Sequence, residues 1–361
     1  MLRIKRWGVF CIGLILCMAC TKKYQDAIHL QSAMQTVDHD PQEALQLLEK
    51  MPYPELLDHD NYMRYVVTLT QARNMDHQDI TGDTLILKAQ RYFAGQSDAE
   101  MAVRASYYAA AYWHKKKEEN KALEYFLLAH YFARLAGNNL FQAKSAHWIG
   151  STYYDMDILD SAKVYYHQAE ELYLKVVNTE QNQLDIKYML GRTYRELEQY
   201  DPALDYFNEG LDMSQELHNQ LYESHFLHNK GIICREMEAY EPAKEYFNLA
   251  LSKKPEAEDS LRIFLSYARL YRATGQPDST KYYLDQVKNR VEELSFPYNR
   301  VIAYRELTYY HDKEGNSRET EHYSRLLLKS YIDIFNAYGV NPKYKQSTSN
   351  LRRIHKKQSK I

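Results

Sequence analysis

The chain has 361 residues, of which only 12 are Gly and 9 are Pro, and so few turn-forming residues argue against a protein of strands and tight turns. Charge is unevenly distributed: residues 20–342 hold 36 basic and 48 acidic residues, whereas residues 343–361 hold seven basic residues and no acid. Only Cys234 of the four cysteines lies beyond residue 20, which excludes a framework of disulfides within the rest of the chain.

Residues 1–19 have the composition of an export signal, with basic residues first, then a short apolar run and a small residue before Cys20. The segment resembles a bacterial lipoprotein signal, in which Cys20 would become the acylated first residue. Cys17 departs from that pattern, which usually has Leu there, so an ordinary secretory signal or an uncleaved anchor remains an alternative. Thr21 does not match the inner-membrane retention signal of such lipoproteins. We therefore expect an outer-membrane lipoprotein of the cell envelope that faces the periplasm.

In chain order, apolar residues at helical spacing predict a succession of helix pairs. Residues 24–51 form a first pair, broken before Pro41, and residues 60–74 and 84–93 form a second. Later pairs carry one small residue in the first helix and another 12 positions on in the second: Ala110 and Ala122, Gly150 and Ala162, Gly191 and Ala203, Gly231 and Ala243. Thr280 and Thr320 take the second place in two weaker pairs.

The clearest pair runs from Leu190 to Leu211. Its first helix is expected to end near Gln199 and its second to start at Pro202, because a first helical position needs no N–H. Gly191 and Ala203 would let the two backbones approach closely, while larger side chains fill the surrounding space.

The series Leu190, Gly191, Tyr194, Ala203 and Phe207, repeated around Gly231, Ala243 and Phe247, resembles the tetratricopeptide repeat (TPR). In that family two antiparallel helices form one unit, and units stack because each leaves an apolar face uncovered. From Ala122 to Thr320 the second-helix small residues are spaced by 40, 41, 40, 37 and 40. The resemblance implies an all-α fold, a superhelical array (α-solenoid) of about eight TPR-like helical hairpins over residues 20–340.

Residues 341–361 are rich in Lys, Arg, Ser and Gln. We expect a solvated, disordered tail, as is usual for such termini. Contact with anionic lipid or nucleic acid is the alternative, but a nucleic-acid partner is not expected.

Motifs for catalysis or for nucleotide binding are not found in the sequence. The Asp-His pairs that begin at Asp38, Asp58 and Asp76 fall at expected helix starts or in loops, where Asp caps a helix more often than it binds a metal. We therefore expect no enzyme, no cofactor and no metal site.

In the TPR family the first helix of each unit lines a concave groove. Arg195, Arg235 and Arg272 share one groove place in three successive units, which would suit an acidic peptide or a free carboxylate. Asn229 matches a common peptide-holding Asn of the family. The full set of groove candidates is Lys144, His147, Tyr154, Tyr188, Arg192, Arg195, His228, Asn229, Arg235, Arg269 and Arg272. The alternative is that Arg195 and Arg235 pair with adjacent carboxylates, such as Glu196 and Glu236, and only join the units.

These features predict a lipid-anchored scaffold or adaptor that binds a protein or an acidic peptide through the groove. A first alternative is a sensor, since the chain resembles the periplasmic half of TPR regulators whose longer members continue into transmembrane and DNA-binding parts. A second is a glycan-capturing envelope lipoprotein. Such proteins are rich in exposed Trp, whereas this chain has three Trp residues.

Overall fold

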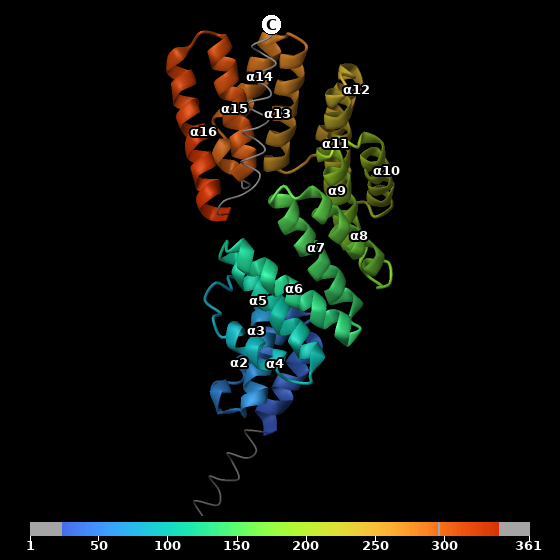
Figure 1. Ribbon diagram of the computed structural model, residues 1–361, viewed down its shortest axis with the longest axis vertical. Helices are drawn as coiled ribbons and strands as arrows, with labels where there is room; N and C mark the ends of the chain where they lie inside the picture. The colour runs from blue at the N-terminus through green and yellow to red at the C-terminus, as the bar shows by residue number, and fades with distance from the viewer. Residues whose placement is uncertain (1–23, 295–296, 339–361) are drawn as a thin grey trace, which may run out of the picture. The chain divides into compact units, whose positions relative to one another are not determined.

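The computed structural model describes residues 24–294 and 297–338, which are helical and contain no strand. The all-α prediction is therefore confirmed (Figure 1). Residues 1–19, Cys20 and residues 341–361, to which the signal, the lipid anchor and the basic tail were assigned, lie outside the described residues. A helix over residues 24–36 is followed by α2 (Pro41–Glu49), η1 (Pro54–Leu56), α3 (His59–Met75), α4 (Ile86–Ala94), α5 (Ala99–Lys115), α6 (Glu119–Ala136), α7 (Asn139–Asp155), α8 (Leu159–Tyr173), α9 (Glu180–Glu196), α10 (Tyr200–Glu216), α11 (Gln220–Glu236), α12 (Tyr240–Ser252), α13 (Ala257–Ala273), α14 (Pro277–Lys288), η2 (Val291–Glu293), α15 (Pro297–Lys313) and α16 (Ser317–Tyr338).

One helix start differs from the prediction, because α10 begins at Tyr200 and not at Pro202. Pro202 is instead the third helical residue. It is tolerated there because the N–H groups of the first helical turn have no acceptor within the helix. The turn before α10 places Glu198 at φ +60°, and the N–H of Gln199 donates to the carbonyl of Tyr194 at 2.9 Å. These contacts satisfy carbonyls that the end of α9 would otherwise leave free.

The chain divides into two compact units, residues 1–145 and residues 146–361, and the division falls inside α7. The N-terminal unit contains the α5/α6 hairpin. One of its apolar clusters includes Phe93, Tyr108 and Phe141, and another includes Leu30 and Leu48.

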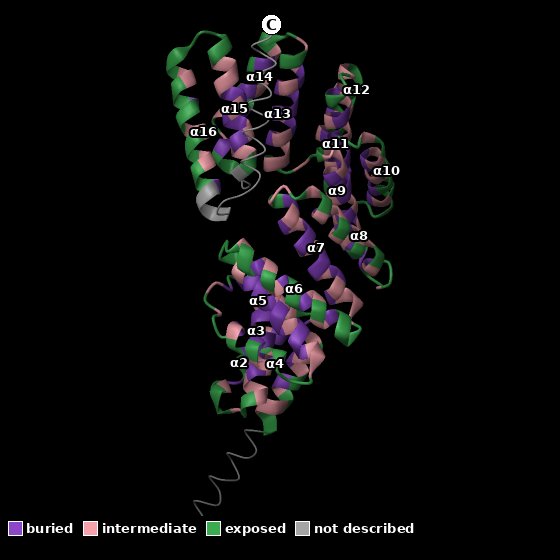
Figure 2. Cartoon of the chain, viewed as in Figure 1, coloured by how far each residue is buried: buried purple, intermediate pink, exposed green. Residues whose placement is uncertain are grey.

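The C-terminal unit contains the hairpins α9/α10, α11/α12, α13/α14 and α15/α16. Phe207 and Phe226 lie in one of its apolar clusters, and Phe247 and Tyr267 lie in another. Figure 2 shows the burial of the described residues: much of α11 and α13 is buried, whereas more than half of residues 317–334 of α16 are exposed.

Close contact between paired helices explains the small residues of the repeat. A Cβ atom built on Gly191 would lie 2.3 Å from the Phe207 ring, and one built on Gly231 would lie 2.5 Å from the Phe247 ring. Neither distance is compatible with a side chain. Ala203 and Ala243, in the facing helices, are completely buried. The glycines therefore make room for an aromatic ring one turn beyond each alanine.

Among the described helices, none is both long enough and apolar enough to cross a membrane.

Candidate functional site

A polar face of the C-terminal unit is formed by the first helices of its hairpins, α9, α11, α13 and α15, each of which contacts the next. Arg195, Arg235 and Arg272 each occupy the second-last position of their helix, where the partial negative charge of the helix C-terminus favours a cation. The three arginines thus hold equivalent places, and their role in binding stays a prediction. We call the following set the arginine face: Arg192, Arg195, Arg235, Arg262, Arg269, Arg272 and Arg305.

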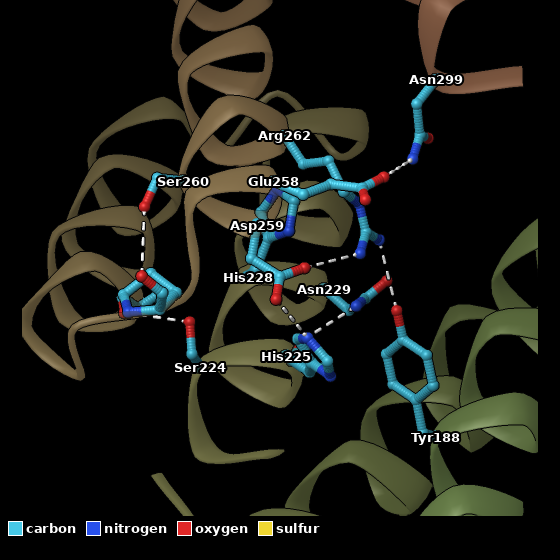
Figure 3. A network of polar contacts seen from close by, with 12 residues as sticks. Tyr188, Ser224, His225, His228, Asn229, Glu258, Asp259, Ser260, Arg262 and Asn299 are labelled. Atoms are coloured by element: carbon cyan, nitrogen blue, oxygen red, sulfur yellow. Dashed lines mark hydrogen bonds and ion pairs between the residues drawn. The ribbon is translucent and has the colours of Figure 1, made fainter. Parts of the chain in front are cut away.

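Figure 3 shows polar contacts that join Tyr188 of α9, Arg262 and Asp259 of α13, and His225 of α11, and a stacking contact between His225 and Tyr188 closes them into a ring. Arg262 donates from Nη1 to Asp259 Oδ1 at 3.0 Å and from Nη2 to the Tyr188 hydroxyl at 3.3 Å. His225 Nε2 lies 3.0 Å from Asp259 Oδ2. The imidazole of His225 also stacks on the ring of Tyr188, with 5.3 Å between ring centroids. The ring joins three successive first helices.

The positive charge around Tyr188 changes its acidity. Burial alone would raise the pKa of the phenol, but the guanidiniums of Arg262 and Arg192 outweigh burial and lower the pKa of Tyr188 below its ordinary value. Burial lowers the pKa of His225, yet its hydrogen bond to Asp259 and its closeness to Tyr188 raise this pKa above the ordinary value. In this ring the phenol oxygen therefore serves as an additional acceptor for a cluster with few anions.

Two of the groove candidates are occupied by contacts between helices. Asn229, which is 1% exposed, accepts from Arg195 Nη1 and donates from Nδ2 to the carbonyl of His225 at 2.8 Å. His228, which is 4% exposed, places Nε2 2.8 Å from Ser266 Oγ. Burial holds the pKa of His228 well below its ordinary value, so this imidazole is neutral at pH 7. A peptide would reach these two side chains only by displacing their present partners.

The remaining arginines share few carboxylates. Arg195 and Arg235 each contact the following glutamate, Glu196 at 2.5 Å and Glu236 at 3.1 Å. One carboxylate serves three arginines, since Glu306 lies 3.5 Å from Arg269, 3.1 Å from Arg272 and 3.8 Å from Arg305. The pairing of Arg195 and Arg235 with adjacent glutamates, which was the alternative expectation, is present in the structure. It leaves the face as a whole with more guanidiniums than carboxylates.

The other candidates are placed as follows. Arg192 lies over the ring of Tyr154 at 4.9 Å and over that of Tyr188 at 5.3 Å, in cation–π contacts. His147 is kept neutral, because burial lowers its pKa to about 4. Lys144 belongs to the N-terminal unit, where it lies over the ring of Phe141. The structure therefore groups Tyr154 with the candidates of α9, α11 and α13, and the cation–π contact of Lys144 lies within the N-terminal unit.

Sequence reasoning missed the acceptors Asp259 and Glu306. A signal for them exists in the spacing, because three contacts between successive first helices join residues 34 positions apart: Arg195 with Asn229, His225 with Asp259, and Arg272 with Glu306. Arg195 and Arg235 are 40 positions apart. Asn229 thus lies six residues, or nearly two helical turns, before the place equivalent to Arg195 in the next helix, whereas the period of 37 from Arg235 to Arg272 puts Asp259 three residues before the place equivalent to His225.

In the part of the chain that the structure describes, no three His, Cys, Asp or Glu side chains are grouped as a metal site would require.

A family model described as "Tetratricopeptide repeat" matches residues 141–216 and 182–256. Among solved structures, the chain is similar to NprR in complex with its cognate peptide NprX, with a TM-score of 0.63 and 16% identity over 91% of this chain and 98% of that one. Apo NprR from B. thuringiensis is similar with a TM-score of 0.63 and 16% identity, over 90% of this chain and 97% of that one. The apo form of RapI is similar with a TM-score of 0.61 and 14% identity, over 86% of this chain and 98% of that one. No curated protein sequence matches the chain.

At these identities the solved structures define the fold, and the family model defines the repeat within it. Both agree with the alternation of paired helices and with the buried small residues at the hairpin contacts. Residues 141–256 therefore match the tetratricopeptide repeat, and the described part of the chain has an all-helical, TPR-like solenoid fold.

Proposed function

We propose that this protein is a lipid-anchored adaptor of the bacterial cell envelope that binds an acidic segment of a protein or peptide through the arginine face. One observation carries the binding part of the proposal. Six of the seven guanidiniums of the face form ion pairs with four carboxylates among the described residues, Glu196, Glu236, Asp259 and Glu306, and the seventh, that of Arg192, lies over the rings of Tyr154 and Tyr188. Guanidinium forks bind carboxylates with two parallel hydrogen bonds, so acidic side chains are the chemistry that would balance this face.

The solved structures support a peptide as ligand, because a protein of similar fold was solved with one. NprR was crystallised in complex with its cognate peptide NprX. A second similar structure is that of a Rap protein complexed with Competence and Sporulation Factor. Their identities to this chain are 16% and 12%, so the resemblance supports a binding mode of the fold and names no ligand.

Peptide binding can be tested with fluorescein-labelled (Glu-Gly)5 and its (Lys-Gly)5 counterpart, by fluorescence anisotropy at low salt. We expect the acidic peptide to bind and the basic one not to bind. Substitution of Arg195, Arg235 and Arg272 together by Ala should weaken binding at least tenfold, since a charge-assisted hydrogen bond contributes about 1.5–3 kcal/mol.

The matched control replaces three exposed arginines outside the face, Arg91, Arg134 and Arg325, by Ala. This control has the same change in net charge and should retain binding. Unchanged affinity in the Arg195, Arg235 and Arg272 variant, with a native unfolding transition, would reject the arginine face as the binding surface. Equal losses in both variants would show a nonspecific charge effect and would reject it too.

The anchor and the envelope location rest on the sequence around Cys20. We propose that several acyl chains on this cysteine hold the protein in the outer membrane, facing the periplasm, because a single chain binds membranes only marginally. Metabolic labelling with palmitate should label the wild type and not Cys20→Ser, and fractionation should find the wild type in outer membranes. A labelled Cys20→Ser protein, or an unlabelled wild type, would reject the anchor.

A further inference from the structure

Arg235 is the most deeply buried member of the arginine face. Its residue is 7% exposed, and its Nη2 lies 3.1 Å from Glu236 Oε1. Its Nη1, however, is buried and has no hydrogen-bond partner among the described residues. A buried guanidinium donor without an acceptor loses its hydration and gains nothing in return. Arg235 Nη1 is therefore free to donate a hydrogen bond to an anion or to another acceptor.

A second buried donor without a hydrogen bond lies on the next first helix, α13. Arg269 Nε is also buried without a hydrogen bond, and the nearest carboxylate oxygen of Glu306 is 3.5 Å away in an ion pair. Glu306 already accepts a hydrogen bond from Arg272 at 3.1 Å. Arg235 of α11 and Arg269 of α13 are 34 positions apart, which is the separation that joins Arg195 to Asn229 and Arg272 to Glu306, so the two side chains hold neighbouring places on adjacent helices. In agreement with this register, burial and the charge of Arg269 lower the pKa of Arg235 to about 10. Two like charges on adjacent helices thus each have a buried N–H group without a hydrogen bond.

Arg262, on the same face, is an arginine whose hydrogen-bond acceptors all come from the protein itself. Its Nη1 donates to Asp259 and its Nη2 to the hydroxyl of Tyr188, so both ends of its fork have acceptors (Figure 3). Neither Arg235 Nη1 nor Arg269 Nε has an equivalent acceptor within the described chain. Arg235 thus lacks an acceptor oxygen at Nη1, whereas both Nη atoms of Arg262 have one.

We propose that Arg235 and Arg269 together bind one oxyanion, a carboxylate or a phosphate group, which supplies that oxygen. Two guanidiniums around one oxyanion can form several charge-assisted hydrogen bonds and remove the repulsion between them. The group would enter beside Arg269, whose side chain is 30% exposed, whereas that of Arg235 is 6% exposed. The inference deepens the proposed function and rests on it in one respect, namely that an acidic side chain of the bound segment would be the natural oxyanion.

The experiment measures thermal unfolding of the full chain in a chloride-free sulfonate buffer at constant ionic strength, with added acetate, inorganic phosphate or chloride. We expect acetate or phosphate to raise the midpoint of the wild type by about 3 °C at ten times its dissociation constant. Chloride, which cannot bridge two forks with two oxygens, should raise it less. Direct titration calorimetry with the same salts should give one site per chain.

Arg235→Met is the test variant, because Met keeps the apolar length of the side chain and removes the charge. It should lose the midpoint shift and the calorimetric signal. Arg325→Met, at a position with a 78% exposed side chain, should keep both. A wild type without oxyanion-dependent stabilisation, or an Arg235→Met protein that keeps it, would overturn the proposal.

The (Glu-Gly)5 peptide separates this inference from the proposed function. If peptide binding fails but phosphate still binds in an Arg235-dependent manner, the site takes a free oxyanion and the adaptor proposal is wrong. If the peptide binds through the arginine face and neither acetate nor phosphate has an effect, the adaptor proposal stands and the oxyanion site is overturned.

Discussion

Arg104 of the N-terminal unit and Arg235 of the C-terminal unit both lie on first helices, yet their surroundings differ. Arg104 donates to both oxygens of Asp38, at 2.9 and 2.7 Å, and lies 3.0 Å from Glu100. Arg235 has one glutamate and an unused Nη1. Arg104 lies 18 positions before Ala122 of its hairpin and Arg235 lies 8 positions before Ala243, so the two hold different places in the repeat. The comparison teaches that an arginine of a first helix is satisfied only where the neighbouring helices bring enough acceptors to it.

The two units also differ at the contact within a hairpin. The place held by Gly191 and Gly231 in the C-terminal unit is held by Ala110 in the N-terminal unit, also 12 positions before its partner Ala122. Ala110 is completely buried with its Cβ in place, whereas a Cβ on either glycine would overlap a phenylalanine ring. The residue at this place therefore depends on the aromatic ring in the facing helix: Gly is required where the ring fills the position of a Cβ atom, and Ala fits where it does not.

The largest effect is expected at this hairpin contact. Gly231→Ala would place a methyl group 2.5 Å from the Phe247 ring and 3.2 Å from the carbonyl of Ala243, so helix α11 must shift from α12. We expect a loss of about 2–3 kcal/mol in the free energy of unfolding, as for other overpacked cores, measured by urea denaturation. Gly82→Ala, with no atom within 4 Å, is the control and should change little. A loss below about 0.5 kcal/mol for Gly231→Ala would show that the close approach is not required.

A smaller effect is expected at the ion pair between Asp38 and Arg104. Burial tends to raise the pKa of Asp38, but hydrogen bonding and charge from Arg104 hold this pKa below its ordinary value of 3.8. The pair therefore stabilises the fold above pH 3.8, and this contribution is lost as the pH falls through the lower pKa of the folded state.

Asp38→Asn should cost about 1–2 kcal/mol at pH 7, less than a fully buried pair, because the Asp38 side chain is 36% exposed and screened by solvent. The difference between wild type and variant should shrink as the pH is lowered below 3.8, in urea titrations at each pH. A difference that does not depend on pH would mean that the carboxylate charge does not contribute.

The smallest effect is expected at the turns, where the two units should behave alike. Glu238 in the C-terminal unit and Lys117 in the N-terminal unit both have φ +60°, a left-handed conformation that costs a side-chain-bearing residue about 1 kcal/mol. Glu238→Gly and Lys117→Gly should therefore each raise the free energy of unfolding by about 0.5–1 kcal/mol.

The reverse substitution supplies the control, since Gly275 has φ +70° and nothing within 4 Å of a built Cβ. Gly275→Ala should lower the free energy of unfolding by a similar amount, about 1 kcal/mol. Opposite signs for Glu238→Gly and Lys117→Gly would show that the turns of the two units are not equivalent.

Much of the fold could be predicted because the repeat encodes local contacts. The helices α3 and α4 begin and end within about two residues of the predicted ranges 60–74 and 84–93, since apolar spacing and capping residues act within one or two turns. The start of α10 was misplaced because Pro fits at any of the first helical positions and therefore marks a helix start only approximately.

The candidate site was predictable in part. Equivalent places for Arg195, Arg235 and Arg272 follow from the period of the repeat. The contact of Arg262 with Tyr188, 74 positions away, depends on how three hairpins stack, and no local pattern encodes that distance. Glu306 was predictable in part, because Arg305 adjoins it in the sequence and Arg272 precedes it by 34 positions, but its sharing with Arg269 and Arg272 also requires the approach of α15 to α13.

By itself the sequence determined the helical hairpins, because their spacing, small residues and turns are properties of neighbouring positions. Only the tertiary structure decided which arginines are satisfied. Hydrogen bonds of a buried guanidinium require oxygens within about 3 Å in the right direction, and those oxygens come from helices that are distant in the sequence. Arg104 received them and Arg235 did not.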